Sequence, residues 1–202
     1  MTSRDTILAS IRRHTTERFP LPDLAPLEQK ALRFDDPVGR FAAVMQQVGG
    51  RAVLLDDGDT PGQCLARLYP SAKRVALAVS GLAGRESLPG QVFDPDALAE
   101  PAELNGTDLA IVPAQLGVCE NGCCWIPQQV RHRALYFIAE ALAIVLRRAD
   151  LVHNMHEAYA RLADNPELAF GCFISGPSKT ADIEQALVMG AHGAREVTVL
   201  LC

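Results

Sequence analysis

Short, nearly continuous apolar runs set the strongest limit on the fold of this 202-residue chain. The clearest are Arg74–Ser80 (RVALAVS) and Asp108–Val112 (DLAIV), and Glu196–Leu201 (EVTVLL) follows near the end. Such runs suit parallel strands that are covered on both faces, because a strand with one solvated face alternates apolar and polar residues. Segments of helical periodicity lie between them. This alternation predicts an α/β sandwich with a largely parallel sheet.

Other elements carry strong start and stop signals. Asp36-Pro37 and Thr60-Pro61 each place a capping side chain before a proline at the first helical position. Gly49-Gly50 stops the first of these helices. The elements predicted in this way are a helix from Pro37 to about Val48, a strand over Arg51–Leu55, a helix from Pro61 to about Tyr69, and a helix from Asp150 to about Leu162.

The first 35 residues differ from the rest. Thr2–Arg18 has apolar residues on one face and predicts a helix that is capped by Thr2 or Ser3. The prolines of Phe19–Pro37 exclude a regular helix and favour an extended chain. We therefore expect an N-terminal helix with a proline-rich strap over residues 1–35, and an α/β domain over residues 36–202.

Composition and charge exclude several classes of protein. Hydrophobic residues make up 49% of the chain, which indicates a globular fold. No apolar run is long and clean enough to cross a bilayer, and the N-terminus lacks a cleavable signal pattern. The net charge of −5 gives no basic surface for nucleic acid. The six cysteines lack a regular disulfide spacing, so we expect a reducing, cytoplasmic setting.

The segment from Phe170 to Cys202 carries the most informative local pattern. Cys172–Ile174 is strand-like, Ser175-Gly176-Pro177-Ser178 is a sharp turn, and Ala181–Met189 has helical spacing. A helix N-terminus presents unpaired N–H groups and a partial positive charge, which can hold a carboxylate or phosphate. Ser178 or Thr180 can cap one donor, and Lys179 adds a positive charge. The alternative is an ordinary capped helix.

These residues resemble a known family. Ser175–Glu184 (SGPSKTADIE) and Gly190–Glu196 (GAHGARE) are similar to the signature of the LutC/YkgG family, the LUD domain. The family commonly has Arg in place of Lys179 and Pro in place of Ala194. The resemblance implies a three-layer α/β/α sandwich related to ribose-5-phosphate isomerase, glucosamine-phosphate deaminase and the CoA-transferases.

The family pattern also bears on Arg133–Arg148 (RALYFIAEALAIVLRR). The Ala and Leu content of this segment fits a helix, while Tyr136–Ile138 and Ala143–Leu146 fit two strands. The resemblance favours the two strands.

Glu120-Asn121-Gly122 supplies the candidate catalytic group. Ligands of open α/β sheets lie beyond the carboxyl ends of the strands, and a turn leaving Val112 is a candidate for that edge. The tripeptide resembles the turn that carries the catalytic glutamate of class I CoA-transferases. Glu120 would be a nucleophile or general base, and Asn121 and the N–H of Gly122 would stabilise an oxyanion. The alternative is an ordinary turn residue.

The predicted anion-binding residues come from the two segments just described. His192 could bind an anion or transfer a proton there, or it could simply stabilise the end of a helix. The predicted set is Asn121, Gly122, Ser175, Gly176, Pro177, Ser178, Lys179, Thr180, Asp182, Glu184, His192 and Gly193.

The cysteines raise the question of a metal. Cys119, Cys123 and Cys124 form a Cys-x-x-x-Cys-Cys run that could hold zinc or an iron–sulfur cluster. No second paired motif accompanies it, and strand alternation would point Cys123 and Cys124 to opposite faces. Buried cysteines often behave as small apolar residues. We therefore predict no metal site in this chain. His153 and His156 form an incomplete site by themselves.

The resemblance implies a component of an L-lactate utilisation system that oxidises lactate to pyruvate. In this interpretation the Ser175–Glu184 loop binds a small organic acid, a phosphate-bearing ligand or an iron–sulfur partner. No cofactor is expected in this chain, and iron–sulfur clusters would lie in partner subunits of the LutA/LutB type. The chain could be a non-catalytic subunit, and it could form a homo-oligomer.

Two alternatives remain for the function. The first is a stand-alone enzyme of the CoA-transferase or sugar-phosphate isomerase type that uses Glu120. The second is an assembly module that uses the N-terminal helix and the proline-rich strap.

Overall fold

The chain divides into two compact units, Met1–Ala31 and Leu32–Cys202. The computed structural model describes residues 2–17, 19–20, 22–23, 25–28, 30–163, 170–180, 188–189 and 193–202. The first unit contains α1 (Ser3–His14) and α2 (Ala25–Glu28). At the start of α1, Thr2 and Asp5 form a capping box, and no residue of α1 is buried. No helix in the described ranges is long and apolar enough to span a membrane.

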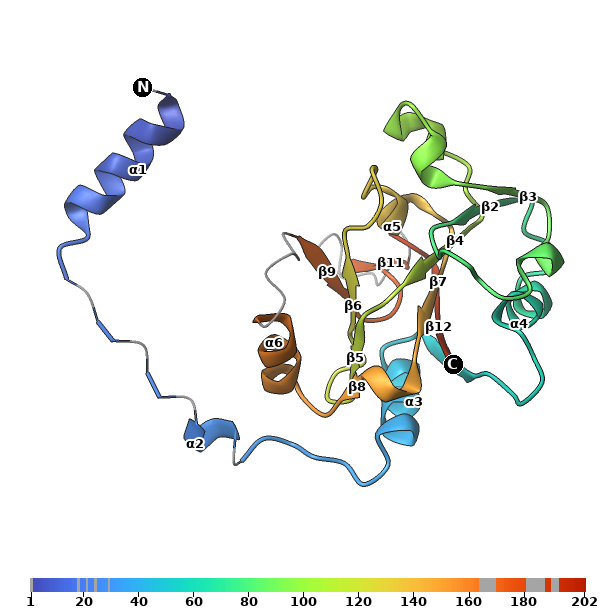
Figure 1. Cartoon of the computed structure of the whole chain (residues 1–202), viewed down its shortest axis with the longest axis horizontal. Helices are drawn as coiled ribbons and strands as arrows, with labels where there is room; N and C mark the ends of the chain where they lie inside the picture. The colour runs from blue at the N-terminus through green and yellow to red at the C-terminus, as the bar shows by residue number, and fades with distance from the viewer. Residues whose placement is uncertain are drawn as a thin grey trace. The chain divides into compact units, whose positions relative to one another are not determined.

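A six-stranded sheet forms the centre of the second unit, in the order β1-β12-β7-β4-β2-β3 (Figure 1). Each pair of neighbouring strands is parallel. The prediction of a largely parallel sheet is therefore confirmed. The strands are β1 (Arg51–Leu54), β12 (Glu196–Leu201), β7 (Ala141–Leu146), β4 (Leu109–Pro113), β2 (Arg74–Leu77) and β3 (Gln91–Phe93).

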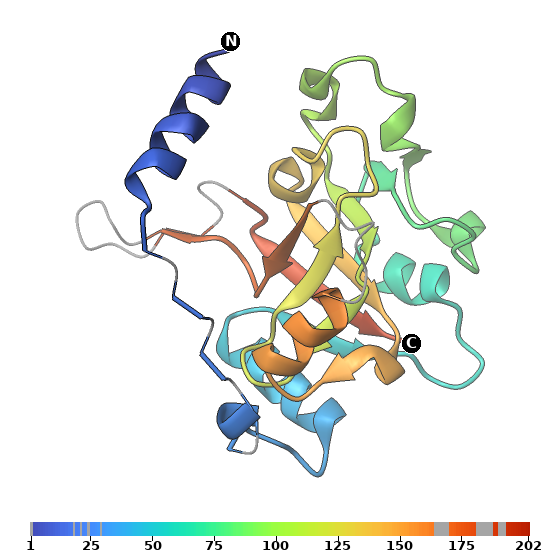
Figure 2. The same ribbon diagram turned by 60° about the vertical axis from the view of Figure 1, so that its left-hand side comes forward.

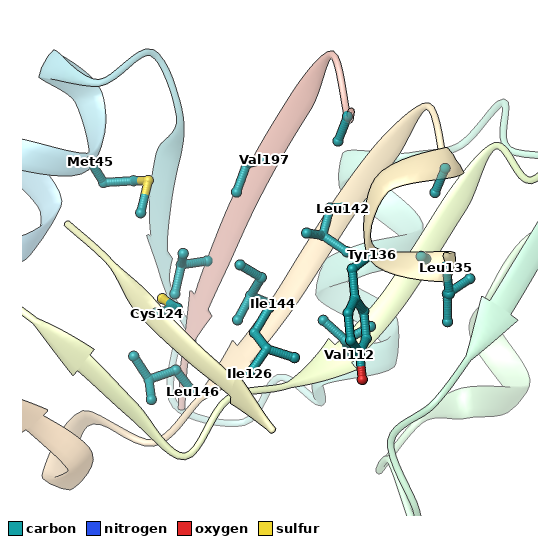
Figure 3. Packing of buried hydrophobic residues seen from close by; sticks show 14 of the residues in the cluster. Met45, Val112, Cys124, Ile126, Leu135, Tyr136, Leu142, Ile144, Leu146 and Val197 are labelled. Atoms are coloured by element: carbon teal, nitrogen blue, oxygen red, sulfur yellow. The ribbon is translucent and has the colours of Figure 1, made fainter. Parts of the chain in front are cut away.

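Both faces of this sheet are buried. In β7, Leu142, Ile144 and Leu146 enter one hydrophobic cluster, and the residues between them enter another. The first cluster includes side chains of α3 (Pro37–Gln47) and α5 (Leu135–Ile138) (Figure 3). The second includes side chains of α4 (Pro61–Leu68). Helices on both faces of a parallel sheet make the predicted α/β/α arrangement.

A second sheet of four strands packs on the first, and the sequence patterns did not predict it. Its order is β8-β5-β6-β9. In β6, Cys124 and Ile126 are buried in the cluster beneath α3, while Trp125 packs with Phe173 in a third cluster. Helix α6 (Met155–Ala163) covers this outer side (Figure 2). The strands are β5 (Leu116–Val118), β6 (Cys124–Pro127), β8 (Leu151–Val152) and β9 (Gly171–Ile174).

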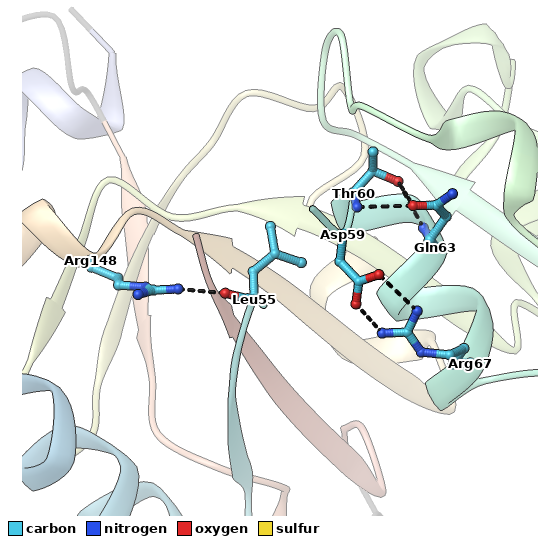
Figure 4. A network of polar contacts seen from close by, with 6 residues as sticks. All are labelled: Leu55, Asp59, Thr60, Gln63, Arg67 and Arg148. Atoms are coloured by element: carbon cyan, nitrogen blue, oxygen red, sulfur yellow. Dashed lines mark hydrogen bonds and ion pairs between the residues drawn. The ribbon is translucent and has the colours of Figure 1, made fainter. Parts of the chain in front are cut away.

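The helix starts at Pro37 and Pro61 are confirmed. The N–H of Gly39 donates to Asp36 Oδ1 at 2.9 Å, and Thr60 and Gln63 form a capping box (Figure 4). Arg67 of α4 pairs with Asp59, just before that cap. These contacts satisfy the N–H groups that a helix start leaves without partners.

Between residues 133 and 162 one predicted strand is wrong, and one predicted helix is present but begins later than expected. Tyr136–Ile138 belongs to the short helix α5, in which the Tyr136 hydroxyl donates to the carbonyl of Pro127 at 3.1 Å. Asp150 caps no helix, because its carboxylate pairs with Arg147. The next helix begins at Met155, and the cap is Asn154, whose Oδ1 accepts from the N–H of Glu157 at 3.0 Å.

The end of the helix predicted over Ala181–Met189 is wrong, because Val188–Met189 is a strand. Lys179–Thr180 (β10) pairs antiparallel with Val188–Met189 (β11). Thr180 stands opposite Val188, and β-branched residues favour such extended pairs. Residues 181–187 lie outside the described part.

The last residues of the predicted strap are attached to the α/β unit, which begins at Leu32. Asn154 Nδ2 donates to the carbonyl of Leu32 at 2.9 Å. The N–H of Phe34 donates to His153 Nδ1 at 3.1 Å, and Arg33 forms an ion pair with Glu157. The amino-acid composition assigned residues 32–34 to the strap. Their hydrogen bonds and ion pair, however, are made with residues at the start of α6.

Candidate functional site

Glu120, Asn121 and Gly122 form the tight turn between β5 and β6. The N–H of Gly122 donates to the carbonyl of Val118 at 2.9 Å, and Asn121 Oδ1 accepts from the N–H of Cys123 at 3.1 Å. Gly122 has a φ of 69°, a conformation that favours glycine. The turn that the sequence predicts is therefore present, and it joins two strands of the second sheet.

The carboxylate of Glu120 is engaged by the protein itself. Its Oε2 accepts a hydrogen bond from the N–H of Met155 at 3.0 Å, and the residue is half-buried. Met155 is the first residue of α6. A carboxylate at this position satisfies one of the free N–H groups of the helix start and suits the helix dipole. Glu120 thus ties the β5–β6 turn to α6.

The structure brings the two predicted site segments together. Ser175 Oγ donates to the carbonyl of Asn121 at 2.8 Å. We call this contact the Asn121–Ser175 junction. It arises because β6 and β9 are antiparallel, which places the residue after β9 beside the turn before β6.

The residues after Ser175 are held closely. Gly176 has a φ of 69°, and a Cβ placed there would lie 2.6 Å from the carbonyl oxygen of Val48. Pro177 is buried. The N–H of Ser178 donates to the carbonyl of Ala194 at 3.0 Å, and a Cβ on Gly193 would lie 3.0 Å from that of Ser178. The signature residues therefore hold one another in place.

Anion binding at the start of the predicted helix stays a prediction, because residues 181–187, where that helix would begin, lie outside the described part. Lys179 and Thr180, just before it, are in a strand. The N–H of Ser178 is already paired with Ala194. The Lys179 side chain is exposed, and within the described residues no ion pair or hydrogen bond joins it to Glu120. The predicted residues Asp182, Glu184 and His192 lie outside the described part.

Comparison with known proteins identifies the family. The family model described as the LUD domain matches residues 101–202, half of the chain. This chain belongs to the LUD-domain family. The match covers the Glu120 turn and the whole Ser175 segment.

Relatives of this LUD-domain chain carry one name. The protein named Lactate utilization protein C from Deinococcus radiodurans is 23% identical over 100% of this chain and 92% of its own length. That from Bacillus pumilus is 38% identical over 36% of this chain, and that from Geobacillus kaustophilus is 32% identical over 34%. The matched region spans about a third of these last two proteins, 32% and 31%.

A solved structure shares the fold. A protein of the DUF162 family from Deinococcus radiodurans superimposes with a TM-score of 0.62 at 19% identity. The match covers 82% of this chain and 95% of the other. The α/β fold of the LUD domain described above is thus shared with a known structure.

The cysteines of the LUD domain are mostly packed. Cys119 is buried, its thiol donates to the carbonyl of Pro37 at 3.2 Å, and burial raises its pKa to about 11. Burial also raises the pKa of the Cys124 thiol. Cys123, just before β6, packs in a different cluster from Cys124, so the two side chains point to opposite faces as predicted. Among the described residues no group of three His, Cys, Asp or Glu side chains is placed to hold a metal ion.

His153 and Glu157 have structural contacts at the start of α6. The ring of His153 accepts from the N–H of the strap residue Phe34, and the backbone N–H of His153 donates to Glu157 Oε2 at 2.8 Å. His153 therefore has partners within the protein at the start of α6.

A cavity of about 640 Å³ lies elsewhere, and its residues were not among those predicted. It opens where β2, β3 and β4 end, and its lining includes Arg85 and Asp94 but not Glu120. The carboxyl edge of the sheet is the expected place for a ligand of an α/β protein. Which loops meet there depends on strand order, and strand order is not visible in a local sequence pattern.

Proposed function

We propose that this chain is a LutC-like component of a lactate utilisation system. One observation carries the proposal: the alignment with the Deinococcus radiodurans protein named Lactate utilization protein C runs along the whole of this chain. The LUD-domain match and the two other relatives of that name support it.

The Ser175–Glu184 segment is the proposed contact with a small organic acid or with an iron–sulfur partner. The Asn121–Ser175 junction and the close fit of Gly176 against Val48 fix the start of the segment. Lys179 follows directly and is exposed. A rigidly based segment with an exposed cation can bind a carboxylate or an acidic partner surface with little loss of conformational entropy.

We place the iron–sulfur clusters of the system in partner subunits. Cluster ligands are thiolates. Burial keeps Cys119 and Cys124 in the thiol form, since it raises the pKa of both groups. Both side chains also fill the hydrophobic core of the domain. Their chemistry therefore suits packing better than cluster ligation.

A stand-alone CoA-transferase activity would need Glu120 as a free nucleophile. Its half-buried carboxylate instead accepts from the N–H of Met155. No contact in the described residues favours this second function over the first, and we do not propose it.

Deletion of the gene tests the proposal. We expect the deletion strain to lose growth on L-lactate and to retain growth on pyruvate, and the wild-type gene to restore growth on lactate. Normal growth of the deletion strain on lactate would contradict the proposal.

The partner is tested by purification. The tagged full-length chain is isolated from lactate-grown cells, and co-purifying iron is measured together with the visible absorption of iron–sulfur clusters. A Lys179→Glu variant should lose this partner, while Arg85→Met, a variant remote in sequence, should retain it. Loss with both variants or with neither would argue against the Ser175–Glu184 segment as the contact.

A further inference from the structure

The strand order creates a topological switch point between β2 and β4. These strands are neighbours in the sheet. From β2 the chain continues to β3 on one side, and from β4 it continues to β7 on the other. Where connections leave adjacent parallel strands in opposite directions, a crevice opens at the carboxyl ends, and α/β proteins bind their ligands there.

The cavity of about 640 Å³ lies at this switch point. The ends of the three strands contribute Leu77, Phe93 and Pro113 to its lining. The connection after β2 contributes Arg85, and the connection after β4 contributes Gln129. Its volume is in the range of small-molecule sites, which have ~300–1,000 Å³.

The segment that carries Arg85 is held by tight packing on α4. The N–H of Gly62 donates to the carbonyl of Ala83 at 2.9 Å, and a Cβ on Gly62 would lie 2.0 Å from the carbonyl oxygen of Gly84. Leu82 and Leu88 are buried on either side of Arg85. The base of the Arg85 side chain is therefore fixed, which lowers the entropic cost of using it for binding.

The part of the lining that follows β3 is fixed in a similar way. Asp94 Oδ1 accepts from the N–H of Asp96 at 2.9 Å. Asp96 Oδ1 accepts from the N–H of Arg131 at 2.7 Å, which ties the loop after β3 to the connection after β4. Both carboxylates line the cavity, and each has a second oxygen that can accept from a ligand hydroxyl.

The polar groups of the cavity differ in what they recognise. Arg85 offers a planar guanidinium that suits a carboxylate or phosphate, and no carboxylate among the described residues forms an ion pair with it. Asp94 and Asp96 are acceptors and suit hydroxyl groups. Leu77, Phe93 and Pro113 add apolar surface. A ligand matching this set carries one anionic group and several hydroxyl groups.

We propose that the switch-point cavity binds a hydroxylated anion, with the anionic group on Arg85 and hydroxyl groups on Asp94 and Asp96. The volume suits a ligand larger than a three-carbon acid. This site is separate from the Ser175–Glu184 segment, and it does not depend on the proposed role in lactate utilisation.

Calorimetric titration of the full-length chain tests the site. The probes are D-gluconate, D-ribose 5-phosphate, the neutral polyol sorbitol, and acetate, which has no hydroxyl group. We expect gluconate or ribose 5-phosphate to bind, and sorbitol and acetate to bind at least about tenfold more weakly. The anion that binds more tightly shows whether Arg85 prefers a carboxylate or a phosphate.

Matched variants assign the site. Arg85→Met keeps the length of the side chain and removes its charge, so binding of the preferred anion should fall about tenfold or more. Lys73→Met makes the same kind of change at an exposed residue outside both the cavity lining and the Ser175–Glu184 segment, and it should leave binding unchanged. Circular dichroism and the thermal midpoint verify that both variants are folded.

The outcomes decide whether the cavity is the binding site. Binding that is lost with Arg85→Met and kept with Lys73→Met supports the cavity. Binding that survives Arg85→Met, or that is lost with Lys73→Met as well, overturns it, as does the failure of both hydroxylated anions to bind.

Discussion

Glu120 and Met155 are joined by a hydrogen bond of 3.0 Å from the backbone N–H of Met155 to the Glu120 carboxylate. The two residues are far apart in sequence, and each is placed by a different element. Glu120 stands in the turn after β5, and Met155 begins α6 after β8, the strand that pairs with β5. The carboxylate therefore closes a corner of the second sheet, and its first role is structural.

We predict that Glu120→Ala destabilises the domain by about 1–2 kcal/mol, the usual cost of losing a side chain that caps a helix start. Glu120→Gln keeps an acceptor oxygen and should cost less than half as much. Urea unfolding measures both. Equal stability of the alanine variant and the wild type would show that Glu120 is available for chemistry instead.

Gly176 gives a sharper test of the signature segment. Alanine is unfavourable there in two ways, because φ is 69° and an added Cβ would lie only 2.6 Å from the carbonyl oxygen of Val48. We expect Gly176→Ala to cost about 2–4 kcal/mol.

Gly106 is a matched control for that prediction. It has a φ of 73°, but a Cβ there would meet nothing within 4 Å. Gly106→Ala should therefore cost only the backbone term of about 1 kcal/mol. If the two variants unfolded at the same urea concentration, the close contact with Val48 would have no energetic weight.

The buried thiol of Cys119 should make the free energy of unfolding depend on pH in the alkaline range. Burial raises its pKa from 9.0 to about 11, so the folded state favours the protonated thiol. The stability that comes from keeping this thiol protonated is fully present below pH 9 and is lost as the pH rises to about 11. Its size is roughly 2 kcal/mol.

The measurement is the free energy of unfolding of the wild type and of Cys119→Ala at several pH values from 8 to 11. The difference between the two proteins removes the effect of other groups that titrate in this range. We expect the stability of the wild type to fall more steeply. Parallel curves would contradict the raised pKa.

Local signals account for the elements that the sequence predicted well. Leu109–Pro113 and Glu196–Leu201 are short apolar runs with no competing helical period, and both are central strands. Asp36 and Thr60 precede prolines, and both cap helices. Each of these signals acts within a few residues, so it can be recognised before the fold is known.

The elements that were missed depend on tertiary partners. Strand β5 is only three residues long, and β10 only two, so neither gives a periodic pattern. Ala181–Met189 has helical spacing, yet its last residues pair with β10. Arg85 and Asp94 line one cavity only because β2, β3 and β4 are neighbours. The sequence brought the Glu120 turn and the Ser175 segment to notice, but the role of each is set by these long-range contacts.

Substitutions of Asn154 can test how the last strap residues are attached, because its side-chain oxygen and nitrogen have separate partners. Oδ1 accepts from the N–H of Glu157 and caps α6, while Nδ2 donates to the carbonyl of Leu32. Asn154→Ser keeps a neutral capping oxygen and removes the donor that reaches Leu32. We expect this variant to remain as stable as the wild type within about 1 kcal/mol, and trypsin to cleave it faster at Arg33.

Asn154→Ala is the comparison for that variant. It loses both contacts, so it should be cleaved faster and also be less stable by about 1–2 kcal/mol. Cleavage is followed by mass spectrometry of the native protein, and stability by urea unfolding. If Asn154→Ser is cleaved at the wild-type rate, the Phe34–His153 hydrogen bond and the Arg33–Glu157 ion pair hold the strap residues without the Leu32 contact. If it unfolds as readily as Asn154→Ala, the serine oxygen does not replace Oδ1 in the cap, and the two roles of Asn154 are not separable.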